Sequence, residues 1–133
     1  MPIRADFTGT WTADLVASRL RGQLPGEIIA SVVHSEPDLH VDMTIVAADG
    51  EPTHLAFDAR STGDPIVNTV LGGEWISRSR WVGHELLIES EVSHQGRQLR
   101  FRDYWSLSED GRRLTMEHRD DDLAGQVTVL ERI

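Results

Sequence analysis

Asp103 and His118 are the two residues of this sequence whose types and spacing best suit chemistry. Segments 99–107 and 114–118 each alternate apolar and polar side chains, and Gly111 lies in a turn signal between them. If an antiparallel hairpin pairs the end of the first segment with the start of the second, Asp103 lies opposite His118. Side chains opposed in this way have Cβ atoms about 4.5–5.5 Å apart. We therefore expect an Asp–His pair on an otherwise apolar face.

This pair has two interpretations. In the first, Asp103 is a general base, or His118 is the base and Asp103 orients it. Burial raises the pKa of a carboxyl group while a nearby imidazolium lowers it, so the balance depends on the depth of the pair. In the second, the two residues form a satisfied polar pair that fixes the strand register, and structural pairs also perturb pKa values. A Ser–His–Asp nucleophile is disfavoured, since the sequence has no nucleophile elbow.

Segment 74–82 places two tryptophans around two serines on one face of a strand, namely Trp75, Ser77, Ser79 and Trp81. Such a wall suits a ligand that carries both rings and polar groups. Packing of the indoles into a core is the alternative. The other inward-facing residues that we expect to bind a ligand are His34, Met43, Phe57, Ile88, Ser90, Phe101, Trp105 and Met116.

Two groups of residues raise the question of a metal. His34, His118 and Asp103 all face inward, but three ligands must lie within about 2 Å of one metal. We favour a hydrogen bond from His34 to Glu36 or to the backbone, and we expect no metal site. The carboxylates of segment 120–122 precede Gly125, yet their spacing does not fit an EF-hand, which favours a solvated acidic turn over a calcium site.

Composition narrows the classes of partner. The 133 residues fit one domain, 1–133, with a real core. The net charge of −9 argues against nucleic acid or an anionic membrane, and all 13 basic residues are arginines, which we expect on outward faces. Cysteine is absent, which excludes disulfides and thiolate chemistry. No apolar span of about 20 residues and no signal core is present, so we expect a cytoplasmic protein. We expect no cofactor, and the oligomeric state stays open.

The elements that position these residues are short strands joined mostly by hairpin turns. About ten strands without a strong helix indicate an all-β fold, an up-and-down antiparallel barrel. Segment 15–26 reads as a loop or a short helical turn. Pairing Val92 with Leu99 sets Ile88 opposite Asp103, so the register is consistent from hairpin to hairpin. The strand segments are 7–11, 28–34, 39–46, 53–59, 66–70, 74–82, 86–92, 99–107, 114–118 and 127–132.

We expect a contact between the first and last strands. Arg132 can reach the ring face of Trp11 and form a cation–π contact. We expect an architectural role for this contact.

The chain also resembles a known family. Segment 7–11, FTGTW, resembles the Gly-x-Trp opening of calycins, which are the lipocalins and fatty-acid-binding proteins. Segments 34–39, 81–90 and 105–126 are similar to a group of small bacterial lipocalin-like proteins without an assigned function. The resemblance covers almost the whole chain, implies a barrel with a lumen open at one end, and places the inward His118 within the pattern of the group. Related nitrobindin-like haem proteins have a glycine-rich opening strand that this chain lacks, so we expect no haem.

Fold and residues together favour two functions. The first is binding of a small hydrophobic or aromatic molecule in the barrel lumen, an expectation that rests partly on fold analogy. The second is a lumen-based acid/base enzyme, such as an isomerase, cyclase or hydrolase, that uses Asp103 and His118.

Overall fold

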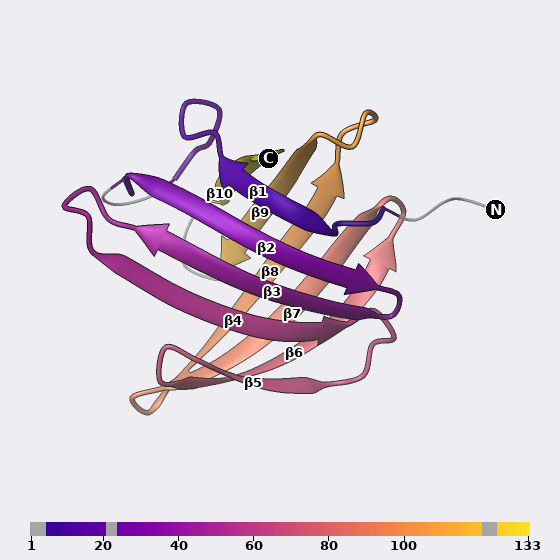
Figure 1. The fold of residues 1–133 in the computed structure, drawn as a ribbon. Coiled ribbons are helices and arrows are strands. Elements are labelled where there is room, and N and C mark those ends of the chain that lie inside the picture. The colour runs from indigo at the N-terminus through magenta and orange to yellow at the C-terminus, as the bar shows by residue number, and fades with distance from the viewer. Residues whose placement is uncertain (1–4, 21–23, 121–124) are drawn as a thin grey trace.

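The computed structural model describes residues 5–20, 24–120 and 125–133. The described residues form ten antiparallel strands in one sheet that curls into a nearly closed barrel, in the order β4-β3-β2-β1-β10-β9-β8-β7-β6-β5 (Figure 1). The predicted all-β, up-and-down barrel is confirmed. No helix within these residues is long and apolar enough to cross a membrane. The strands are β1 (Gly9–Ala13), β2 (Glu27–Ser35), β3 (Asp38–Val46), β4 (Pro52–Arg60), β5 (Ile66–Val70), β6 (Gly73–Val82), β7 (Glu85–His94), β8 (Arg97–Leu107), β9 (Arg113–Asp120) and β10 (Gln126–Arg132).

Alternation of side chains sets the register of these strands. In β2, Ile28, Ala30, Val32 and His34 are buried, and the residues between them are more exposed. One face is therefore committed to the interior, and a slip by one residue would expose it. The predicted pairing of Ile88 with Asp103 between β7 and β8 is confirmed.

The barrel closes in two different ways. The first and last strands, β1 and β10, pair in an ordinary antiparallel ladder. Between β4 and β5 the closure depends on a side chain, because the amide of Asn68 accepts the Asp58 N–H at 2.9 Å and donates to the Asp58 carbonyl at 2.8 Å. We call this junction the β4–β5 seam.

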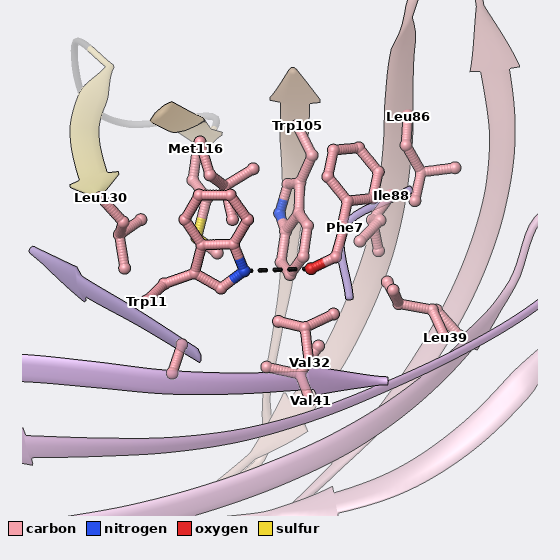
Figure 2. Close-up of a cluster of buried hydrophobic side chains, with 13 residues drawn as sticks. Phe7, Trp11, Val32, Leu39, Val41, Leu86, Ile88, Trp105, Met116 and Leu130 are labelled. Carbon is pink, nitrogen blue, oxygen red and sulfur yellow. Dashed lines mark hydrogen bonds between the residues drawn. The ribbon is translucent and has the colours of Figure 1, made fainter. Parts of the chain in front are cut away.

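Large side chains fill one half of the barrel (Figure 2). The indole N–H of Trp11 donates to the carbonyl of Phe7 at 3.0 Å, and both side chains are fully buried. Around them pack Val32, Leu39, Val41, Leu86, Ile88, Trp105, Leu114, Met116 and Leu130. We call this the closed half.

Phe7 differs from the expectation that it belongs to the first strand, because β1 begins at Gly9. Before β1 begins, side-chain hydrogen bonds replace the backbone hydrogen bonds that would otherwise pair this segment with β2. The Thr8 hydroxyl accepts the His34 N–H and donates to the His34 carbonyl, and the Phe7 N–H donates to Nδ1 of His34. The chain turns in at this point, so the phenyl ring plugs the closed half.

A polar network surrounds this plug. Since Nδ1 of His34 accepts the Phe7 N–H, Nε2 carries the ring proton and donates it to Oε1 of Glu36 at 3.0 Å. The Trp81 indole donates to the same oxygen at 2.8 Å, and its ring stacks on Phe7 with centroids 6.0 Å apart. The predicted hydrogen bond from His34 to Glu36 is confirmed.

Arg132 joins both ends of the chain. Its guanidinium lies 4.3 Å from the Trp11 ring centroid, as the sequence predicts, and it donates to the Thr8 and Gly111 carbonyls. A Cβ at Gly9 would collide with this guanidinium, and the φ of Gly9 is +150°, so glycine is required there.

Two segments lie partly outside the described residues. Residues 15–17 form a turn and Arg19 pairs with Val127 in an isolated bridge, which fits the predicted loop, whereas Arg21 and Gly22 are not described. Of the acidic turn, the candidate calcium ligands Asp121 and Asp122 lie outside the described residues.

The Arg132 clasp gives a stability prediction. Arg132→Ala should lower the free energy of unfolding by about 1–2 kcal/mol, because one cation–π contact and two hydrogen bonds are lost. Arg132→Lys should recover part of this, since it keeps the charge but not the forked donor. Urea denaturation measures the difference. Arg78→Ala on the outer face of β6 is the control, and an equal effect of both alanine variants would contradict the clasp.

Glu36 gives a pH prediction. Burial raises the pKa of Glu36, but hydrogen bonds from Ser61, His34 and Trp81 outweigh it and hold the pKa below the usual value of 4.5. The stabilisation is therefore complete above the unfolded-state pKa and is lost as pH falls through the lower folded-state pKa.

Glu36→Gln should therefore be less stable than the wild type at neutral pH, and the difference in the free energy of unfolding should shrink as pH falls below 4.5 and through the lower folded-state pKa of Glu36. Urea unfolding at several pH values measures this difference. Glu109→Gln, in an exposed turn, controls for the loss of one carboxylate. A difference in stability that stays constant at the lowest pH measured would show that these hydrogen bonds do not lower the pKa of Glu36.

Candidate functional site

The half of the barrel away from the Phe7 plug holds a cavity of about 170 Å³. Three side chains of the closed half, Ile88, Trp105 and Met116, also line this cavity. Figure 2 shows them within the buried cluster. The cavity is partly open, and its walls come from seven strands, β3 to β9. The remaining lining residues are Met43, Leu55, Phe57, Asn68, Trp75, Ser77, Ser90, Asp103 and His118. We call it the lumen cavity.

The predicted pairing of Asp103 with His118 across β8 and β9 is confirmed. Nδ1 of His118 lies 2.7 Å from Oδ1 of Asp103, and the two side chains are 25% and 23% exposed. Nε2 of His118 lies 3.8 Å from a carboxylate oxygen of Asp120, at the end of β9. The imidazole therefore lies between two carboxylates, with a ring edge on the lumen cavity.

Other polar groups on the cavity wall are few. The hydroxyls of Ser77 and Ser90 face each other across β6 and β7 and are 2.9 Å apart, so one of them donates to the other. The second hydroxyl keeps a proton that this bond does not use. Asn68 adds one amide hydrogen beyond the two bonds that it makes at the β4–β5 seam.

Aromatic rings make up much of the wall. Phe57 meets Trp105 edge to face, with ring centroids 6.3 Å apart. Trp75 lies 5.6 Å from Phe101, and Phe101 in turn lies 5.0 Å from the His118 ring. Phe101 is not on the cavity wall itself, but it contacts two residues that are.

The structure divides the predicted ligand-binding residues. Eight of them line the lumen cavity, with Asp103 and His118, namely Met43, Phe57, Trp75, Ser77, Ile88, Ser90, Trp105 and Met116. His34 and Trp81 lie in the network of the closed half instead. Ser79 is buried, and its hydroxyl has no hydrogen-bond partner among the described residues. The alternating face is thus inward throughout, but only one part of it reaches the cavity.

Leu55 and Asn68 line the cavity without having been predicted. Leu55 lies on the same strand face as Phe57, and Asn68 lies on the same strand face as Ile66 and Val70. The alternation of inward and outward residues therefore indicated that both side chains face the interior. A polar residue at an inward position of a short strand was the specific sign at Asn68.

The three residues weighed as metal ligands do not meet. His34 bonds to Glu36 in the closed half, and Asp103 and His118 bond to each other at the cavity. Across residues 5–20, 24–120 and 125–133, no group of three or more histidine and carboxylate side chains is arranged to hold a metal ion.

A second hollow of about 310 Å³ lies near the β3–β4 turn and is more open. Its wall is almost entirely aliphatic and carries no ionisable side chain, with Leu20, Leu24, Pro25, Ile28, Ile45, Ala47, Ala48 and Gln126 as lining residues. The lumen cavity combines an apolar wall with polar groups that face its interior, which is the pattern of small-molecule sites.

Comparison with known proteins identifies the fold. No family model and no curated protein matches the sequence. Secretory abundant heat soluble protein 4 from Ramazzottius varieornatus superposes with a TM-score of 0.63 at 9% identity, over 100% of this chain and 99% of that one. Fatty-acid-binding protein 1 from Echinococcus granulosus gives 0.62 at 11% identity, over 96% and 97%. Zebrafish ileal bile acid-binding protein, in complex with cholic acid, gives 0.54 at 13%, over 97% and 100%. The fold is therefore an antiparallel β-barrel like that of these proteins.

Proposed function

We infer that the chain binds a small hydrophobic or aromatic molecule in the lumen cavity. The observation that carries this proposal is a cavity of about 170 Å³ whose wall is mostly aromatic and aliphatic. A comparable apolar cavity of about 150 Å³ accommodates benzene, so the space suits a molecule about the size of one substituted ring. The bile acid and fatty acid named for the structural neighbours agree with an apolar ligand in this fold, although they are larger.

Filling the cavity tests the proposal. Ser90→Phe should place a phenyl ring in the cavity and weaken the binding of toluene at least about tenfold, which is about 1.4 kcal/mol. Ligand-observed NMR and calorimetry measure the affinity, and native mass spectrometry of gently purified protein shows any molecule already held. Val67→Phe, exposed on β5, should leave binding unchanged. Toluene that binds equally to both variants would place its site outside the lumen.

A second candidate function is acid/base catalysis in the same cavity, and the contact of 2.7 Å between His118 and Asp103 favours it. If Nδ1 donates its proton to Asp103, Nε2 is left unprotonated and can accept a proton from a substrate or a water molecule. Asp103 then acts as the residue that orients the imidazole. An isomerase, a cyclase or a hydrolase fits this arrangement.

Hydrolysis of p-nitrophenyl acetate tests this second function, because the ester is small and an unprotonated imidazole accelerates its hydrolysis. His118→Gln should reduce the rate about 10²-fold, in the usual range for loss of a general base. His40→Gln is a matched control, since His40 also lies between two carboxylates but on the outer face. Equal losses in both variants would indicate nonspecific surface histidine chemistry and would contradict the catalytic role.

The compartment and the wider family stay predictions. A cytoplasmic protein and a bacterial lipocalin-like group remain our expectations from the sequence.

A further inference from the structure

We propose that the lumen cavity selects a compact organic amine, bound as a cation, and rejects carboxylate ligands. This inference rests on the proposed binding function and adds the charge of the ligand to it. Three features of the lumen cavity carry it: a carboxylate oxygen without a hydrogen-bond partner among the described residues, the aromatic rings on the cavity wall, and the size of the space.

Only one of the two carboxylate oxygens of Asp103 accepts a hydrogen bond from the described residues. Its Oδ1 accepts the hydrogen bond from His118, while its Oδ2 has no hydrogen-bond partner among the described residues. The side chain is 23% exposed and lies on the cavity wall. A ligand N–H group can therefore donate to Oδ2 without displacing His118, and a charged donor makes the stronger bond.

No basic side chain is available to receive an anion. Among the described residues that line the lumen cavity, none is arginine, and His118 is the only imidazole. His118 contacts Asp103, and its Nε2 lies 3.8 Å from a carboxylate oxygen of Asp120. Two protein carboxylates therefore already balance any positive charge on the imidazole. A ligand carboxylate in the cavity would lie close to Asp103 with no counter-charge of its own. Burial of an unpaired anion is costly, so the site disfavours it.

The aromatic rings of the lumen cavity strengthen the preference for a cation. Phe57, Trp75 and Trp105 line the same cavity. Aromatic faces attract an organic cation within about 6 Å of the ring centroid, and the attraction grows when water is excluded. A cavity lined by a carboxylate and by aromatic rings is therefore a better receptor for an ammonium group than for a neutral molecule of equal size.

Size limits the rest of the ligand. The volume of about 170 Å³ admits one ring with a short substituent but not a long alkyl chain. The spare proton of the Ser77–Ser90 pair offers a second polar contact, and Ser90 lies on β7, the strand next to that of Asp103. The expected ligand is thus a ring-sized amine, a different class from the fatty acid or bile acid in the names of the structural neighbours.

Four probes that share one benzene ring and differ in charge test the inference. They are benzylamine, benzyl alcohol, toluene and benzoate, each titrated into the full-length protein by calorimetry at neutral pH. Benzylamine should bind at least about tenfold more tightly than toluene and benzyl alcohol, and benzoate should bind more weakly than toluene.

A pair of variants then assigns the effect to Asp103. Asp103→Asn keeps the shape and should weaken benzylamine binding at least about tenfold, while the affinity for toluene stays within about twofold. Asp58→Asn is the matched control, because Asp58 makes the same contact of 2.7 Å with a histidine Nδ1, from His40, on the outer face. It removes the same charge from the protein and should leave benzylamine binding unchanged.

The outcomes separate the two proposals. Benzoate or toluene binding as tightly as benzylamine would overturn the preference for a cation and leave lumen binding intact, as would equal benzylamine losses in the two asparagine variants. If Ser90→Phe weakens none of the four probes, lumen binding itself fails. Thermal melts establish that each variant folds. If Asp103→Asn does not fold, the order of affinities of the four probes for the wild-type protein tests the preference for a cation by itself.

Discussion

The strict alternation of side chains in a closed antiparallel meander is the constraint on which this structure depends. Every second residue of every strand points into the barrel, so all inward side chains share one enclosed space. The register between β8 and β9 places Asp103 opposite His118, and the register between β7 and β8 places Ile88 beside Asp103. A slip by one residue would send the pair to the outer surface and expose its apolar neighbours.

The interior is used in two different ways along its length. In the closed half, Phe7 and Trp11 are fully buried, and a network around Glu36 satisfies the polar atoms of His34 and Trp81. Dense packing of this kind supplies most of the stabilisation of a small fold. The other half contains an incompletely filled space and a partly exposed ionisable pair, neither of which adds much stability. The molecule thus concentrates its packing at one end and has the cavity and the Asp103–His118 pair at the other.

Much of this was visible in the sequence, for a physical reason. Period-two patterns and turn residues determine which side chains face inward and which pair across strands, so the contact of Asp103 with His118 was predictable. The height of a residue along the barrel axis is not encoded in that pattern. Ser77 and Ser79 look alike in sequence, yet only Ser77 reaches the cavity. Phe7 was missed as a plug because Thr8 replaces the backbone ladder with side-chain bonds, a substitution that no periodicity reveals.

One side chain hydrogen-bonds across the junction where the barrel has no backbone ladder. Nine junctions around the perimeter are backbone ladders, whereas β4 and β5 are joined by the two hydrogen bonds of the Asn68 amide. Each such bond contributes only about 1 kcal/mol net, so the perimeter is most easily widened at this point. Asn68 also lines the cavity. The amide that joins β4 to β5 is therefore also part of the wall of the lumen cavity, so a change in that wall at Asn68 would act on the closure of the barrel as well.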